Sequence, residues 1–66
     1  MSNKKKSDLN AGARVSFQAR HGEVVGSIIE IIDDSVIVAS DLDHSHRYRI
    51  PLAYVLASET FKLLKS

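Results

Sequence analysis

Hydrophobic and polar residues alternate along the first part of the chain, a pattern typical of β-strands rather than helices. Residues 13–18 carry apolar side chains on one face and polar ones, Arg14 and Ser16 among them, on the other. This alternation predicts a half-buried strand whose apolar face meets the core. A turn over Ala19–Gly22 should follow it, because Gly22 can adopt a positive φ without steric cost.

The longest predicted strand is Glu23–Ile32, which is rich in valine and isoleucine. Gly26 stands inside it, and an isolated glycine in a strand marks a bulge or a sharp bend. Such a bend lets one strand serve both halves of a small barrel. The expected faces are Val24 and Ile28 on one side, and Val25, Ile29 and Ile31 on the other. Curling of the sheet, or a partner chain, would cover the second set.

Two further strands are expected after this one. Asp33 and Asp34 form a tight turn, and Ser35–Ser40 has the apolar centre of a buried strand. A polar loop over Asp41–Ser45 leads to a strand over His46–Ile50, which ends at Pro51 because proline cannot donate to a ladder. In that strand the alternation points Tyr48 and Ile50 inward, and Arg47 and Arg49 outward.

The last part of the chain admits two interpretations. Pro51–Tyr54 has room for one helical turn with proline at its first position, and Val55–Leu56 with Phe61–Leu64 reads as a final pair of short strands. A helix over Tyr54–Leu64 is the alternative, since its apolar residues also have acceptable helical spacing. We favour the strands.

The beginning of the chain differs in composition from the rest. Residues 1–11 are rich in lysine, serine and asparagine and carry little apolar surface apart from Leu9, so we expect a disordered basic tail. Residues 12–66 are expected to form one domain, near the lower size limit at which a chain folds alone. A domain of this size has little room for an enclosed substrate pocket.

Composition and charge narrow the class of protein. There is no cysteine, no apolar leader and no apolar run of the ~18–20 residues that a bilayer span needs, so we expect a cytoplasmic protein that does not enter the membrane. From Gly12 onward, six basic side chains stand against seven acidic ones. A nearly neutral domain argues against tight, nonspecific nucleic-acid binding, which depends on phosphate neutralisation.

The region 12–38 resembles a KOW-type motif, the glycine-centred hairpin of SH3-like barrels in ribosomal proteins and transcription elongation factors. The matching positions are Gly12, Val15, Gly26, Ile28, Ile31, Val36 and Val38. Most of the chain from Gly12 also resembles a family of small Gram-positive bacterial proteins to which no activity is assigned. That family shares the Ser-Val-Ile-Val strand at Ser35–Val38 and a C-terminal pattern like Val55–Leu64. These resemblances imply a five-stranded SH3-like barrel and bring no activity with them.

The chain is also similar to the plasmid-borne type II dihydrofolate reductases, which are small SH3-like barrels that form their active pore as tetramers. The similarity lies in the bent segment at Gly26 and in the strand that ends at Pro51. The pore strand of that family reads Val-Gln-Ile-Tyr-Pro, whereas this chain has Arg-Tyr-Arg-Ile-Pro at positions 47–51. Because the glutamine and the tyrosine before the proline are absent, the activity is not carried across.

Two groups of residues are candidates for binding. Two carboxylates and two imidazoles lie between Asp41 and His46, but a polar loop explains them better than a metal site does. Arg47 and Arg49 share one face of their strand about 6.5–7 Å apart, a geometry that suits successive phosphates or carboxylates. The residues expected to contact a nucleic acid or another partner are Lys4, Lys5, Lys6, Arg14, Arg20, Arg47 and Arg49.

We find no nucleophile elbow and no glycine-rich phosphate loop, and we expect neither an enzyme nor a bound cofactor. The prediction is therefore an all-β protein, a small five-stranded SH3-like barrel, that acts as a non-catalytic binding module. Two functions remain open. One is protein interaction or assembly, including homo-oligomer formation; the other is an accessory role on RNA or the ribosome, through the tail and the arginines.

Overall fold

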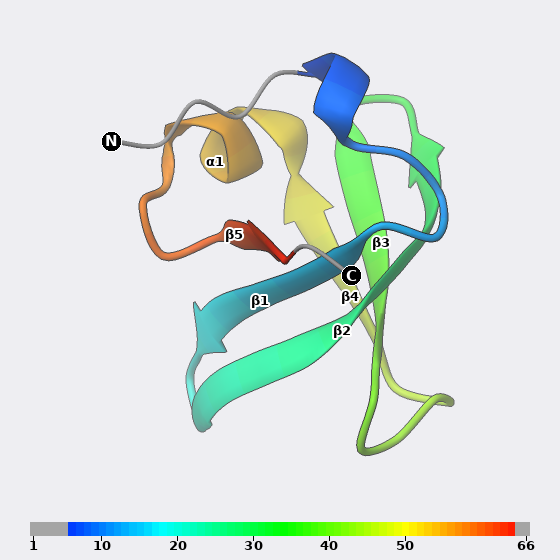
Figure 1. Ribbon diagram of the computed structural model, residues 1–66, viewed down its shortest axis with the longest axis vertical. Coiled ribbons are helices and arrows are strands. Elements are labelled where there is room, and N and C mark those ends of the chain that lie inside the picture. The colour runs from blue at the N-terminus through cyan, green and yellow to red at the C-terminus, as the bar shows by residue number, and fades with distance from the viewer. Residues whose placement is uncertain (1–5, 65–66) are drawn as a thin grey trace.

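The computed structural model describes residues 6–64. It contains a single antiparallel sheet in the order β4-β3-β2-β1-β5, which confirms the prediction of an all-β protein with five strands (Figure 1). The elements in chain order are η1 (Lys6–Asp8), β1 (Arg14–Ala19), β2 (Gly22–Ile32), β3 (Ser35–Ser40), β4 (Arg47–Pro51), α1 (Leu52–Ala57) and β5 (Lys62–Leu64). Strands β4 and β5 are the two edges, and no strand pairing joins them within the described residues.

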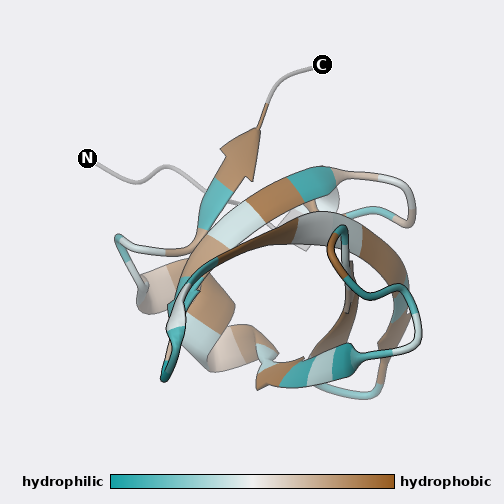
Figure 2. Ribbon diagram, turned by 90° about the horizontal axis from the view of Figure 1, so that it is seen from below, coloured by the Kyte–Doolittle hydropathy of each residue, from teal (hydrophilic) through white to brown (hydrophobic). Residues whose placement is uncertain are grey.

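Strand β2 serves both halves of the sheet, as its length predicts. Residues 22–27 pair with β1, and residues 26–32 pair with β3. The two pairings overlap at Gly26 and Ser27, and Gly26 lies opposite Val15 on one side and Ser40 on the other. The sheet curls strongly around its apolar side, so that a view along it shows a nearly closed ring (Figure 2).

Gly26 is required at this crossing for a steric reason. A Cβ atom built there would lie 2.1 Å from the carbonyl oxygen of Ala39 in β3. No side chain fits at that distance, so only glycine allows β3 to approach β2 this closely. The close approach of β3 therefore occurs at the glycine that the sequence singles out, and the neighbouring backbone occupies the space a side chain would need.

A β-bulge in β2 corrects one of the predicted faces. The register with β3 shifts between Ile28 and Glu30, which leaves Ile29 as an extra residue. An extra residue inverts the alternation beyond it. Ile31 therefore packs against the core, although simple alternation placed it on the opposite face with Val25 and Ile29.

The core lies inside the curl of the sheet. Its buried hydrophobic residues are Leu9, Val15, Phe17, Ile28, Val36, Val38, Ile50, Leu52, Val55 and Phe61. The rings of Phe17 and Phe61 stack at 5.5 Å between centroids, and Tyr48 meets Phe17 edge-on at 5.3 Å. The inward direction predicted for Tyr48 is thus confirmed, with the ring half-buried.

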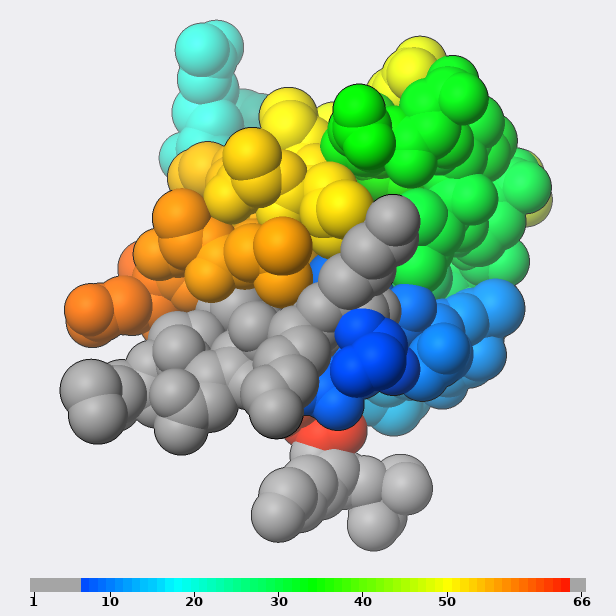
Figure 3. Space-filling model, turned by 90° about the horizontal axis from the view of Figure 1, so that it is seen from above, coloured from blue at the N-terminus to red at the C-terminus, as the bar shows by residue number. Residues whose placement is uncertain are grey.

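The C-terminal prediction is wrong in part. Val55 and Leu56, expected in a strand, lie in α1, and the alternative helix to Leu64 is also wrong because α1 ends at Ala57. The Leu52 amide donates to the Asp34 carbonyl at 2.6 Å, which anchors the start of the helix to the β2–β3 turn. The two segments lie next to each other in Figure 3. Helical spacing turns Leu52 and Val55 into the core together, a burial that a strand could not provide.

We expected the folded region to start at Gly12, but it begins earlier in the chain. Leu9 is only 2% exposed and belongs to the core, and the Gly12 amide donates to the Ile28 carbonyl at 2.6 Å. Residues 1–5 of the predicted tail lie outside the described residues. A second correction concerns Ser16, which is buried although alternation directs it outward. It lies in register between Val25 and Lys62 on the flanking strands, and these larger residues leave its small side chain little exposure.

Candidate functional site

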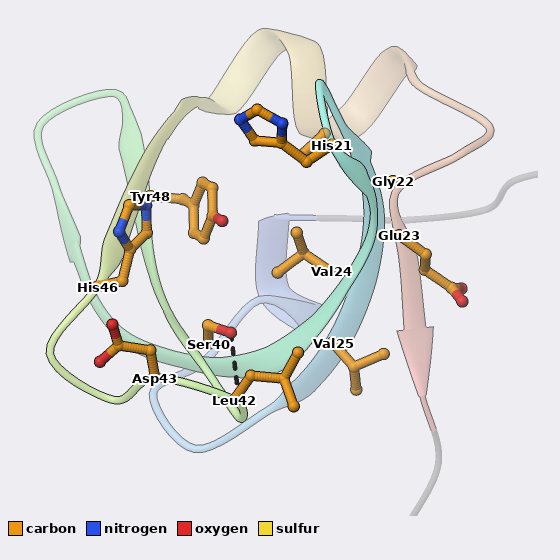
Figure 4. A pocket seen from close by; sticks show the side chains of 11 residues that line it. His21, Gly22, Glu23, Val24, Val25, Ser40, Leu42, Asp43, His46 and Tyr48 are labelled. Atoms are coloured by element: carbon orange, nitrogen blue, oxygen red, sulfur yellow. Dashed lines mark hydrogen bonds between the residues drawn. The ribbon is translucent and has the colours of Figure 1, made fainter.

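A hollow of about 320 Å³ opens at the end of the curled sheet opposite the β2–β3 turn. The β1–β2 turn forms one wall, and the β3–β4 loop with the start of β4 forms the other. The residues that line it are Ala19, His21, Gly22, Glu23, Val24, Val25, Ser40, Leu42, Asp43, His46 and Tyr48. His21, Val24 and Tyr48 point into the hollow, whereas Glu23 points away from it (Figure 4).

The first wall depends on Gly22. Its φ of 125° lies in the left-handed region that favours glycine, as predicted for this turn. The turn leaves His21 exposed at its tip and brings the half-buried Val24 to the inner side of the sheet. Both side chains lie across the hollow from Tyr48, because the curl brings the β1–β2 turn to face the start of β4 (Figure 4).

The second wall is a loop held by several hydrogen bonds. The Asp41 amide donates to the Val25 carbonyl at 2.9 Å, and the Leu42 amide donates to Ser40 Oγ at 3.2 Å. Arg14 Nη1 donates to Asp41 Oδ1 at 2.7 Å, and its Nη2 donates to the second carboxylate oxygen. The bidentate pair ties the loop to β1, on the far side of β2.

The ion pair also shifts the pKa values of both side chains. Chiefly through the hydrogen bonds from Arg14, the pKa of Asp41 is lowered from its ordinary value, and the same contact raises the pKa of Arg14. Both side chains keep about two fifths of their surface in water, so the pair is a partly exposed one. Its role is geometric, because a bidentate guanidinium–carboxylate contact defines the orientation of both groups.

This restrained loop carries the most exposed large hydrophobic residue of the described chain. Leu42 is 98% exposed, at the rim of the hollow. Beside it, Asp43 Oδ1 accepts hydrogen bonds from the Ser45 hydroxyl at 2.6 Å and the Ser45 amide at 3.1 Å. These bonds lower the pKa of Asp43, so a charged carboxylate stands at this rim at neutral pH.

The cluster of acids and histidines between positions 41 and 46 does not converge. Within residues 6–64, no three His, Asp or Glu side chains are placed to hold a metal ion. The Asp41 carboxylate is turned to Arg14, while His46 packs against the ring of Tyr48 at 4.7 Å between centroids. These contacts hold Asp41 and His46 apart within the loop.

The predicted contact residues are spread over the molecule. Arg20 is exposed in the β1–β2 turn, and Arg47 and Arg49 are exposed on β4. Arg14 lies in the same cross-strand row as Arg47, with β2 and β3 between them, which separates the two by about 14 Å. The structure thus brings Arg47 and Arg49 together and leaves Arg14 apart, bound to Asp41. Lys4 and Lys5 lie outside the described residues, and Lys6 begins η1.

Sequence reasoning missed the hollow and most of its lining. We interpreted His21 as a turn residue and gave Leu42 no role. A single apolar residue within a run of loop-forming polar ones was the only signal for Leu42. The lining comes from segments about 20 residues apart in the chain, and only the curl of the sheet brings them together.

No helix among the described residues is both long enough and apolar enough to cross a membrane. Comparison of the chain with protein-family models, with curated proteins and with solved structures found no match.

Proposed function

We propose that this chain is a non-catalytic protein-interaction module of SH3-like design, whose partner binds over the hollow and the loop that presents Leu42. The SH3-like part of the proposal is supported by the curled five-stranded sheet, by a long β2 shared between its halves and by a helical turn before the last strand. The KOW-type resemblance of residues 12–38 points the same way. The absence of cysteine from the sequence fits a protein of the reducing cytoplasm, where disulfides are rare, and we propose that location.

The observation that carries the proposal is the exposure of Leu42 on a restrained loop. Burying a leucine side chain contributes about 1.5–3 kcal/mol. A mobile loop would lose part of this to ordering on binding, but the backbone next to Leu42 is already held by the bonds of Ser40 and Asp41. Leu42 is thus a preorganised apolar anchor beside a hollow of mixed lining that includes Val24 and Tyr48 among polar residues, an arrangement that suits a protein-binding surface.

The His21 and His46 side chains make no hydrogen bond within residues 6–64, and His46 packs against the ring of Tyr48 at 4.7 Å between centroids. The hollow is also open to solvent at the loop rim, which favours recognition over chemistry that needs water to be excluded.

Site-specific crosslinking tests this function. A photoreactive amino acid at position 42 is expected to capture a defined protein, identified by mass spectrometry, in cells that make the protein. The same probe at position 32 is the control, because Ile32 is 41% exposed but lies at the other end of β2. Leu42→Ser should weaken the captured complex about tenfold or more. Capture that does not exceed the control, or a serine variant that binds like the original, would refute the proposal.

Nucleic-acid binding is the second candidate, because Arg47 and Arg49 are exposed side by side on one strand without an ion pair in the described chain. It predicts binding of single-stranded RNA that falls steeply with salt. Replacing both arginines by glutamine should lower the slope of log K against log salt by about 1.4. An unchanged slope would remove these two residues from that role.

A further inference from the structure

The outer edge of β4 presents unpaired backbone groups in a regular order. The β3–β4 register continues beyond both ends of β4, where the Ser40 amide donates to the His46 carbonyl at 3.4 Å and the Leu52 amide donates to Asp34 at 2.6 Å. In an antiparallel ladder, pairs of opposite residues that are hydrogen-bonded alternate with pairs that are not. The even-numbered residues of β4 therefore face β3, and the odd-numbered ones, Arg47 and Arg49, turn their N–H and C=O groups to the open edge.

This edge pairs with no other strand in the described chain. No turn, loop or cap hydrogen bond reaches the backbone of Arg47 or Arg49, and both residues are exposed. Each offers one donor and one acceptor at a spacing of two residues, about 6.5–7 Å. That arrangement matches the backbone of an extended peptide, which adds to a sheet edge as a further strand.

The side chains on this edge set the charge of the partner. Both guanidiniums project from the outer face and have no carboxylate partner within residues 6–64, and the Arg49 Nε donates only to Ser35 Oγ, at 3.2 Å. Acidic residues on an added strand, two apart, would lie directly across from them, where opposite charges stabilise a cross-strand pair. The intervening residue would turn inward, on the side of Tyr48 and the hollow.

We propose that β4 binds an extended acidic segment of the partner protein, with Glu or Asp at alternate positions and an apolar residue between them. This inference rests on the proposed function and names the chemistry of the partner. A second copy of the chain is a poorer occupant, because pairing two β4 edges would bring arginines together, and the β5 edge carries Lys62. A nucleic-acid strand would use the guanidiniums but not the alternating backbone donors and acceptors.

A capped peptide of sequence Ser-Glu-Val-Glu-Val-Glu-Ser serves as the probe, titrated into the full chain and followed by amide hydrogen exchange and NMR shifts. Binding should slow exchange at the Arg47 and Arg49 amides by tenfold or more at saturation, because both become hydrogen-bonded. Changing both arginines to glutamine should weaken binding about 4–25-fold, from 2–5-fold per exposed ion pair. Arg20→Gln, the same change on an exposed turn, should alter affinity less than twofold.

Two matched peptides and an oligouridylate complete the test. The Gln counterpart of the peptide should bind more weakly, and a version with N-methylated glutamate amides, which face β4 when the peptide pairs antiparallel with Glu across from the arginines, should not slow exchange at Arg47 or Arg49. If the methylated peptide binds as tightly, or if the acidic peptide leaves both amides unprotected, the edge proposal is wrong. Tighter binding of the oligouridylate at the same arginines would overturn it in favour of nucleic acid. Leu42 crosslinking reports on the protein-interaction function separately, since it uses no acidic peptide.

Discussion

The replacement Gly26→Ala tests the close packing of the β2 backbone against β3. The added Cβ would meet the Ala39 carbonyl oxygen at 2.1 Å and its carbonyl carbon at 2.9 Å. An acceptable contact needs about 3.2 Å, so the β3 backbone would have to retreat by about 1 Å. Ala39 lies in register with Ser27 on one side and Arg47 on the other, and its movement strains both ladders.

The expected cost follows from three contributions. Overpacking of this kind costs about 1–3 kcal/mol, and a weakened ladder bond adds about 1 kcal/mol. Replacing glycine by alanine in a strand offsets about 0.5–1 kcal/mol of this cost, because alanine lowers the conformational entropy of the unfolded chain. We therefore expect a net loss of about 1–3.5 kcal/mol, centred near 2 kcal/mol, from a total of ~3–5 kcal/mol for a domain of this size.

Urea unfolding followed by far-ultraviolet circular dichroism measures this loss, since the chain has no tryptophan. The midpoint should fall by about 2 M at an m-value of about 1 kcal/mol/M. Ser27→Ala is the matched control on the next residue of β2, and it should cost at most about 1 kcal/mol for the bond from Arg14. Adding Ala39→Gly should not rescue the variant, because the clash is with backbone atoms. A Gly26→Ala protein as stable as the original would refute the reasoning.

Three further predictions concern the core, the loop and the sheet edge. Phe17→Ala should cost about 3–5 kcal/mol and prevent stable folding, whereas Leu42→Ala should change the urea midpoint little, because Leu42 is 98% exposed; equal effects would contradict the assigned core. The lowered pKa of Asp41 means that its pairing stabilises the fold above the ordinary Asp range and that this contribution is lost as the pH falls through the lowered value. The stability difference between the protein and its Asp41→Asn variant should therefore be largest near pH 7 and shrink below about pH 4; a constant difference would refute it. In the free protein, the Arg47 amide should exchange with solvent much faster than that of Tyr48, and the reverse order would show that the assigned hydrogen-bond alternation of β4 is wrong.

Alternation and turn residues predicted most of the strands. The strand Ser35–Ser40 was predicted with both bounds as observed, and the turn at Asp33 and Asp34 is present, with Asp33 at a φ of 52°. These features depend on neighbours in the chain, because a strand face repeats every two residues and a tight turn needs particular backbone angles. Such information is local, and a sequence carries it directly.

The errors occur where the outcome depends on distant residues. The bulge at Ile29 inverts a face, and nothing in the run of isoleucines distinguishes the extra residue. The final segment has apolar spacing that suits a strand or a helix, and the position of Leu52 under the β2–β3 turn selects the helix. Leu9 is a lone apolar residue in a polar segment, and it is buried because it joins the core cluster formed by residues distant in the chain.

In the candidate site, too, some features follow from the local sequence and others only from the tertiary structure. By itself the sequence determined that Arg47 and Arg49 share an outward face with Tyr48 turned inward between them, because strand geometry alone dictates this. The tertiary structure decided that β4 is an edge, that Arg14 is taken up by Asp41, and that His21, Val24 and Tyr48 surround a hollow. The physical reason is that local pattern sets the direction of each side chain, whereas its neighbours depend on how far the sheet curls. One such contact is the close approach of Gly26 in β2 to the Ala39 backbone in β3, which leaves no room for a side chain.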